Sequence, residues 1–226
     1  MAAAALLAWG AGCRQNSTGP LAQAGPEPGP LAFTAGDSLT FDAWLIDGYG
    51  YAIDSSHTTP VWRVLSLNDS WAGATGVTTI LVFPSQPGPG QSPDTLRFRF
   101  LPSGDIAEFG FIAEALRVTG SGTLPPAWDR IAAFSLPTNG TWNAGTDDAA
   151  GLDSLTGTVL GDQGYFVAGF NGVRNAFHGY GVELTSQNLD CTIVVSGNPP
   201  AMLVIREESA YGTGGRLLVM SALVHR

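Results

Sequence analysis

Leu96-Arg97-Phe98-Arg99-Phe100 is the stretch of sequence that decides the fold class. Apolar and charged residues alternate along it, so a strand would turn three large apolar side chains toward a core and two guanidiniums toward the other face. Residues 101–105 follow as a turn, and residues 106–112 read as the return strand. This segment therefore predicts an antiparallel hairpin with one buried face.

The same alternation recurs between turn signals along the chain after residue 30. Asn171-Gly172 is a strong two-residue hairpin signal, whereas the proline-rich residues 84–93 predict a loop because proline lacks the ladder donor. Two helical turns could form at residues 111–117. Strands are expected at residues 39–45, 51–54, 61–65, 78–83, 130–134, 153–160, 164–170, 176–185, 191–195, 202–206 and 216–224. The prediction is an all-β domain with a single antiparallel, strongly curved sheet of about ten strands, a barrel or half-barrel with little helix.

The composition is that of a packed globular domain with an acidic balance. Of its 226 residues, 44% are hydrophobic and 13% are charged, and the mean hydropathy is +0.13. These values exclude a disordered polyelectrolyte, a coiled coil and a collagen. The formal net charge is −9, and the basic residues, all of them arginine, are scattered along the chain. This charge argues against nucleic-acid binding and against attraction of the domain to an anionic membrane surface.

The N-terminal segment has the layout of an export signal. Residues 2–11 are almost wholly apolar, too short to span a bilayer but suited to the apolar region of a secretory signal. Gly10-Ala11-Gly12-Cys13 resembles the bacterial lipobox, in which small residues precede a cysteine that is lipidated and becomes the mature N-terminus. We therefore expect a lipoprotein signal peptide at residues 1–12 and lipidation of Cys13. The alternative is an alanine-rich first helix packed on the fold.

Residues 13–30 are expected to tether the folded domain to the anchored cysteine. They are rich in proline, glycine and small polar residues, with little to bury. Such a tether would let the domain, residues 31–226, stand clear of the membrane. In bacterial lipoproteins an aspartate after the cysteine commonly signals inner-membrane retention. Arg14 stands there instead, which favours an exported protein of the outer membrane or cell surface.

Three blocks of sequence resemble a poorly characterised family of bacterial envelope lipoproteins. They are residues 29–41, residues 94–98 together with 104–110, and residues 203–208 together with 216–219. Leu39 and Phe41 stand where the family pattern has tryptophan and tyrosine. That family looks related to the half-barrel of the periplasmic lipoprotein carrier. The resemblance implies a curved sheet around an apolar hollow that holds acyl chains, and it carries over no catalytic residue.

The sequence offers no catalytic or metal-binding pattern. The Gly-x-Ser-x-Gly elbow of common hydrolases is absent, and no pair among His57, His178 and His225 has the spacing of metal ligands. We therefore expect no enzyme activity, no metal and no cofactor.

Two further groups of side chains have ordinary structural interpretations. Asp147, Asp148 and Asp153 lack the order of a calcium loop and are expected to form a polar turn between strands. Cys191 falls on the apolar face of its strand, so we expect a small buried hydrophobe rather than a disulfide.

Aromatic residues are the remaining candidates for a binding site. Trp44, Trp62, Phe98 and Phe100 are the candidate apolar lining of a ligand hollow, and the alternative is that aromatics fill the core. The first functional hypothesis is a non-catalytic, lipid-anchored envelope protein that binds an apolar ligand or another envelope component. It predicts a hollow of about 300 Å³ or more. The second hypothesis is a structural subunit of an extracellular filament, surface layer or adhesin, which would self-associate through strand edges poorly guarded by charge.

Overall fold

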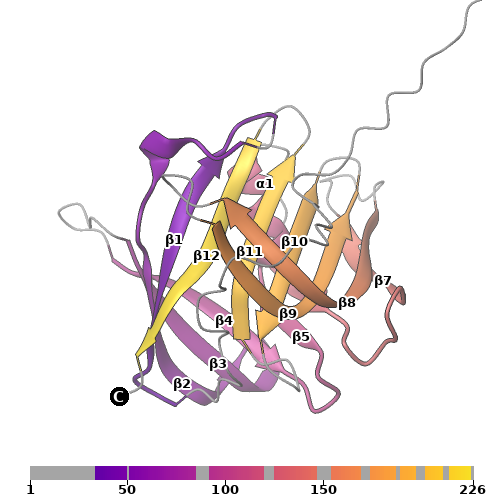
Figure 1. Ribbon diagram of the computed structural model, residues 1–226. Coiled ribbons are helices and arrows are strands. Elements are labelled where there is room, and N and C mark those ends of the chain that lie inside the picture. Colours follow the sequence, from indigo (N-terminus) through magenta and orange to yellow (C-terminus); the bar gives the residue numbers. More distant parts are fainter. Residues whose placement is uncertain are drawn as a thin grey trace, which may run out of the picture.

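One antiparallel sheet makes up nearly all of the structure, a computed structural model (Figure 1). The structure describes residues 34–49, 51–84, 92–119, 125–146, 154–168, 174–186, 189–196, 202–210 and 214–224. The strands are β1 (Ser38–Ile46), β2 (Val61–Trp71), β3 (Ala74–Phe83), β4 (Asp94–Phe100), β5 (Ile106–Phe109), β6 (Trp128–Ala132), β7 (Thr141–Thr146), β8 (Ser154–Ala168), β9 (Arg174–Thr185), β10 (Asp190–Ser196), β11 (Met202–Ala210) and β12 (Gly214–Val224). A 3-10 turn, η1 (Asp54–Ser56), and one helix, α1 (Phe111–Thr119), complete the elements.

The strands follow the chain order around the sheet. Their order is β6-β5-β4-β3-β2-β1-β12-β11-β10-β9-β8-β7, so every pairing but one joins strands that are consecutive in sequence. The exception is the antiparallel pairing of β1 with β12, which joins the two halves of the chain. The all-β fold with a single, strongly curled antiparallel sheet is therefore confirmed.

The alternation that predicts the β4 strand is realised in its burial. Phe98 is 4% exposed and lies between Thr78 of β3 and Glu108 of β5 on the face that contacts the core. Arg97 and Arg99 lie on the opposite face, over aromatic rings. The β4–β5 hairpin forms as predicted, but its second strand ends at Phe109.

The helix α1 forms where the sequence allows two helical turns, at residues 111–117, and it includes the last two residues of the return strand expected at 106–112. Gly110 has φ +80, a left-handed conformation that favours glycine and ends β5. The backbone N–H of Ile112, in the first turn of the helix, then donates a hydrogen bond of 2.9 Å to Oδ2 of Asp129 in β6. A carboxylate from a strand 17 residues away thus caps the helix, and this contact has no signal in the local sequence.

Three other strand boundaries differ from the prediction. Residues 153–160 and 164–170 were expected as separate strands, but the structure has the single strand β8. The return strand expected at residues 51–54 is reduced to one bridge, Ile46 with Ala52, ahead of η1. The strand β7 was not predicted.

The inside of the curled sheet is filled by side chains. Phe41, Phe111 and Ile193 are fully buried in one continuous core, and Cys191 is buried there as expected. The apolar void that remains holds only about 20 Å³, less than a single small ligand needs. Aromatic side chains and α1 fill the space between the described strands, so a hollow larger than the predicted value of about 300 Å³ is found only in an open cleft of this part of the structure, lined in part by β1 and β2.

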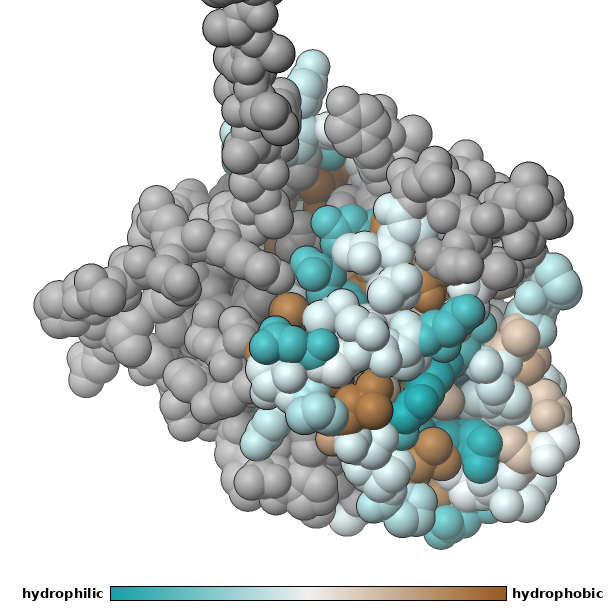
Figure 2. Space-filling view, turned by 90° about the vertical axis from the view of Figure 1, so that its right-hand side faces the viewer, coloured by the Kyte–Doolittle hydropathy of each residue, from teal (hydrophilic) through white to brown (hydrophobic). Residues whose placement is uncertain are grey.

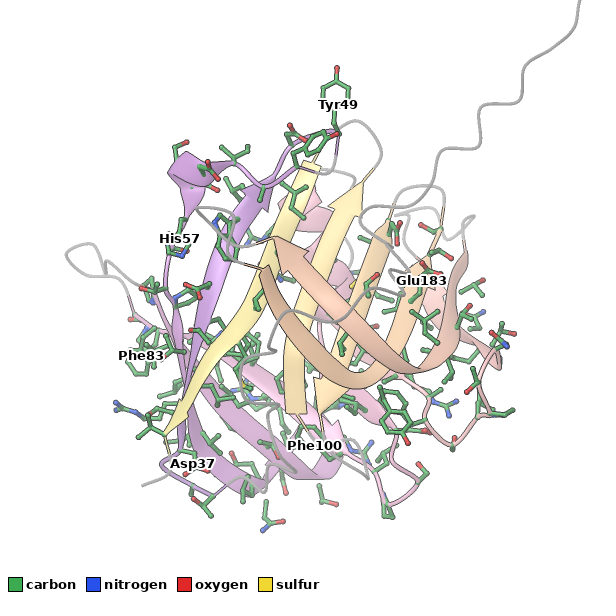
Figure 3. All side chains as sticks on the ribbon, in the orientation of Figure 1. Asp37, Tyr49, His57, Phe83, Phe100 and Glu183 are labelled. Carbon is green, nitrogen blue, oxygen red and sulfur yellow. The ribbon has the colours of Figure 1, made fainter. Side chains whose placement is uncertain are left out.

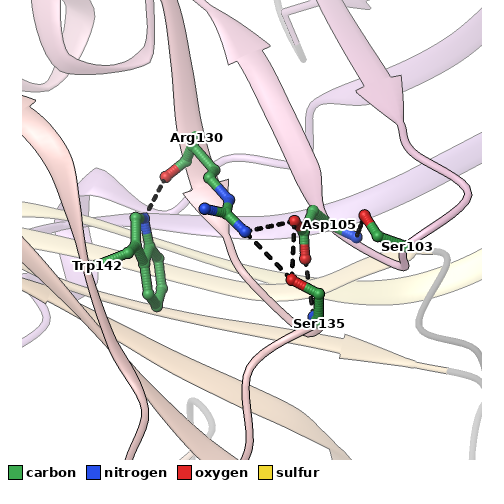
Figure 4. A network of polar contacts seen from close by, with 5 residues as sticks. All are labelled: Ser103, Asp105, Arg130, Ser135 and Trp142. Carbon is green, nitrogen blue, oxygen red and sulfur yellow. Dashed lines mark hydrogen bonds and ion pairs between the residues drawn. The ribbon is translucent and has the colours of Figure 1, made fainter.

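The curl brings the two edge strands, β6 and β7, together at a seam. Nε1 of Trp142 in β7 donates a 2.9 Å hydrogen bond to the backbone carbonyl of Arg130 in β6 (Figure 4). Trp142 pairs across the sheet with Gly157, and a Cβ at Gly157 would lie 2.2 Å from the indole ring. The missing side chain of Gly157 therefore gives the indole the space to reach across the seam.

An ion pair between the buried carboxylate of Asp105 and the more exposed guanidinium of Arg130 supports the same seam. The guanidinium of Arg130 and the hydroxyl and backbone N–H of Ser135 all donate to the carboxylate of Asp105 (Figure 4). Burial opposes ionisation of Asp105, but these hydrogen bonds, first among them that from the backbone of Ser135, hold its pKa below the usual value. The turn after β6 is thus fixed to the turn before β5.

Candidate functional site

An open cleft of about 1450 Å³ lies between α1 and the strands β1 to β4. The helix packs against β6, β11 and β12, behind the last two strands in the view of Figure 1. The opposite wall comes from β1, the residues around η1 and the ends of β2, β3 and β4. The face of the molecule shown in Figure 2 presents hydrophilic and hydrophobic residues interspersed over its described part.

Two buried tryptophans contribute to the floor of the cleft. Trp44 is 8% exposed and Trp62 is 4% exposed, and their strands β1 and β2 place both on the face toward the core. The Trp62 ring packs between Phe41, at 4.5 Å between ring centroids, and Phe98, at 6.4 Å. Its Nε1 atom is buried and has no hydrogen-bond partner. A buried donor without a partner costs free energy, so this N–H lowers the stability of the floor.

A histidine stands above the first of these tryptophans. Nε2 of His57 lies 2.9 Å from Oδ1 of Asp42, and the imidazole lies 4.9 Å from the Trp44 ring between centroids. His57 follows η1 on the left side of the barrel in Figure 3. The tilted contact with the Trp44 ring and the Asp42 contact hold the imidazole at the rim of the cleft.

Charged side chains form the opposite rim. Glu114 on α1 accepts two hydrogen bonds from Arg117, of 2.7 and 2.8 Å, and lies 3.6 Å from Arg216 of β12. Aliphatic and aromatic residues between the rims, among them Val82, Leu96 and Leu218, complete the lining. The cleft therefore combines an apolar floor with charged edges, the arrangement that suits an amphipathic molecule.

Two buried carboxyl groups lie together at the start of α1. Glu108 and Asp129 are direct partners across β5 and β6, and they are 2% and 9% exposed. Burial raises the pKa of Asp129 to about 6, and the charge of Glu108 adds to this effect. The backbone hydrogen bonds from Ile112 and Phe111 act in the opposite direction. Because Glu108 also lines the cleft, the capping of α1 and the shape of the cleft depend on the same pair.

The structure separates the four predicted lining residues into two groups. Trp44 and Trp62 line the open cleft, whereas Phe98 and Phe100 line the small interior void together with Trp62. Figure 3 shows Phe100 within the lower part of the barrel and His57 at its side. Cys13, the tether, Asp147, Asp148, Asp153 and His225 lie outside the described residues, and His178 lies in β9.

The charged rim is not evident from the sequence. Glu114 and Arg117 are three residues apart on α1, and this spacing within the apolar window 111–117 was the available signal. Arg216 joins them only because β12 returns beside β1. Within the described ranges, no three His, Cys, Asp or Glu side chains gather closely enough to hold a metal ion, and no helix is long and apolar enough to cross a bilayer.

Comparison with known proteins adds one distant structural neighbour. The chain resembles a crystal structure of a Bacteroides fragilis protein with a YmcC-like fold, which is thought to be exported, at 13% sequence identity and a TM-score of 0.42. The match covers 84% of this chain and 96% of the neighbour. No family model and no curated protein matches the chain.

Proposed function

We propose that this chain is a non-catalytic, lipid-anchored protein of the cell envelope that binds an amphipathic envelope component in the cleft beside α1. The open cleft carries the proposal, since it joins an apolar floor containing Trp44 and Trp62 to a rim containing Glu114 and Arg117. Its volume of about 1450 Å³ exceeds that of an ordinary small-molecule pocket. An extended ligand with an apolar chain and a polar head fits these dimensions and this chemistry.

Export and anchorage rest on the N-terminal sequence. The apolar residues 2–11, the small residues before Cys13 and the tether to residue 30 support processing as a lipoprotein and placement at the outer membrane or cell surface. The test is mass spectrometry of the mature N-terminus after expression in a bacterial host. An acylated Cys13 is expected, and a Cys13→Ser variant should lose the acyl mass and the membrane fraction. An unmodified N-terminus that starts at Met1 would contradict the anchor.

Ligand binding is tested separately, with a fluorescent fatty acid as the probe. Ala113 of α1 lines the cleft, so Ala113→Trp places an indole in the proposed site. We expect this variant to lower probe affinity at least tenfold. Ala127→Trp is the matched control, because Ala127 is exposed and is not part of the cleft lining. Equal affinities for the two variants would show that the probe binds elsewhere.

The alternative, self-association through strand edges, has weaker support. In the described part of the chain the two edges of the sheet are β6 and β7, and these face each other across the seam that Trp142 bridges. An edge that is covered in this way has little backbone to offer to a neighbouring molecule.

A further inference from the structure

The outer face of β2–β6 carries three arginines that stack on aromatic rings. The guanidinium of Arg63 lies 5.3 Å from the ring centroid of Phe83. That of Arg97 lies 3.5 Å from Trp71, and that of Arg99 lies 5.8 Å from Trp128. Figure 3 shows Phe83 at the outer margin of the ribbon, away from the interior that contains Phe100.

The aromatic partners form a continuous row. Phe109 lies between Trp71, at 6.3 Å, and Trp128, at 5.4 Å, both in edge-to-face contact. The row therefore runs from Arg97 through Trp71, Phe109 and Trp128 to Arg99. Trp71 and the nearby Leu65 are 42% and 54% exposed, which adds apolar surface on the same half of the sheet.

The charge of these three arginines is not neutralised by ion pairs. Within the described residues, no carboxylate oxygen lies within 4 Å of the guanidiniums of Arg63, Arg97 and Arg99. In contrast, Arg117 is paired with Glu114 and Arg130 with Asp105. Asp69 interacts electrostatically with Arg97 at longer range and accepts a hydrogen bond from Thr79. Nε of Arg63 is also buried without a hydrogen-bond partner.

From this face we infer a second binding surface: the outer side of β2–β6 docks on an anionic phospholipid membrane, with Arg63, Arg97 and Arg99 binding lipid phosphates. Stacking orients each planar guanidinium and leaves N–H groups for bidentate binding of phosphate oxygens. Tryptophan and arginine beside exposed leucine suit the boundary between headgroups and acyl chains. A chain with net charge −9 is repelled by such a membrane as a whole, so the local excess of positive charge selects the orientation of the domain.

Arg97 and Arg99 are two residues apart on one strand, about 7 Å, and Arg63 lies two strands away on the same face. Three lipid phosphates can therefore bind side by side. Each arginine near an anionic surface contributes about a fivefold gain in membrane partition. The three together would contribute about a hundredfold gain.

The proposed docking rests on the proposed function, in which a lipid anchor holds the chain at a membrane. To test the docking separately from the anchor, the experiment uses the unlipidated full chain carrying Cys13→Ser. Co-sedimentation is measured with phosphatidylcholine vesicles that contain phosphatidylglycerol and with vesicles of phosphatidylcholine alone. We expect binding to the anionic vesicles only, with a decrease as salt rises. Failure of this test leaves lipidation of Cys13 intact, and failure of lipidation leaves vesicle docking intact.

The variants Arg97→Gln and Arg99→Gln should each lower partition about fivefold. Arg117→Gln is the matched control, because it removes the same charge from an ion-paired residue on α1, outside this face. It should change partition less than twofold. Circular dichroism and thermal melting confirm that each variant is folded, and the salt dependence of the parent chain tests the docking without any substitution in this face.

Three outcomes would overturn the inference. The first is equal loss in Arg97→Gln and Arg117→Gln, which would show that only net charge matters. The second is equal binding to neutral and anionic vesicles. The third is absence of vesicle binding combined with Arg97-dependent binding to soluble dextran sulfate, which would assign the face to an acidic polymer instead of a membrane.

Discussion

Replacing Asp129 with asparagine should stabilise the protein at neutral pH. Asp129 caps α1 through the Ile112 N–H, and an asparagine carbonyl accepts that bond without a negative charge beside Glu108. Burial raises the pKa of Asp129 from 3.8 to about 6, so the folded protein holds the proton more tightly than the unfolded chain. The stability contributed by the protonated form is present below pH 3.8 and is lost as pH rises through about 6.

The size of the effect follows from the shift. About two pKa units at about 1.4 kcal/mol each give a penalty of about 3 kcal/mol for the ionised carboxylate in the folded state at pH 7. Urea unfolding, followed by circular dichroism between pH 4 and pH 8, measures the free energy of unfolding of the variant and of the parent chain. Asp129→Asn should exceed the parent chain in free energy of unfolding by up to about 3 kcal/mol at pH 7, and the difference should shrink toward zero near pH 4.

Asp105→Asn is the control with the opposite sign. The pKa of Asp105 is lowered, so its stability contribution is present above the unfolded value and is lost as pH falls. This variant should be less stable than the parent at pH 7, and the deficit should shrink in acid. A difference between Asp129→Asn and the parent that stays constant from pH 4 to pH 8 would refute the assignment of a proton to Asp129.

Two further comparisons address the tryptophans. Trp62→Phe removes a buried N–H that has no partner, so chemical denaturation should show a change between zero and about 1 kcal/mol of stabilisation, whereas Trp142→Phe removes the bond to the Arg130 carbonyl and should cost about 1 kcal/mol. Equal effects of the two substitutions would contradict this difference in pairing. Gly157→Ala places a Cβ 2.2 Å from the Trp142 ring and should lower the melting temperature, with a cost of about 2 kcal/mol. Thermal melting measures this loss of stability. An unchanged melting temperature would contradict the prediction, because it would show that the Trp142 ring moves away from the new Cβ at little cost.

The sequence predicted the parts of the fold that depend on local periodicity. The alternation from Leu96 to Phe100 identified β4 and its buried face, because side-chain direction in a strand depends only on residue parity. The helix α1 was given only as a possibility, since its cap, Asp129, comes from a strand across the sheet. The unpredicted β7 is short and has Gly145 in its interior, so its alternation of buried Trp142 and Ala144 with exposed Thr141 and Asn143 extends over too few residues to stand out in the sequence.

The candidate site was predicted less well, because it depends on which elements meet. Trp44 and Trp62 line the open cleft, but the sequence could not distinguish an interior hollow from a cleft of this kind, and their role in ligand binding stays a prediction. That distinction depends on how much of the interior α1 and the aromatic rings fill. The three stacked arginines on the outer face of β2–β6 could not be predicted from the net charge of −9, because that number describes the whole chain. The proposed docking depends instead on three guanidiniums that β2 and β4 bring to one face.

The pairing of β1 with β12 has a consequence for the order of folding. Among the strands that the structure describes, ten of the eleven pairings join consecutive strands, and the longest connection between them is residues 110–127, which contain α1. Ser38 pairs with Val224, so the remaining contact must close a loop of nearly the whole domain. The central strand β1 consequently lacks one of its two neighbours until the last strand has been synthesised. The sheet of the nascent chain therefore cannot close before β12 has left the ribosome. A chain that is not yet folded is the state that a secretion channel for unfolded polypeptides requires.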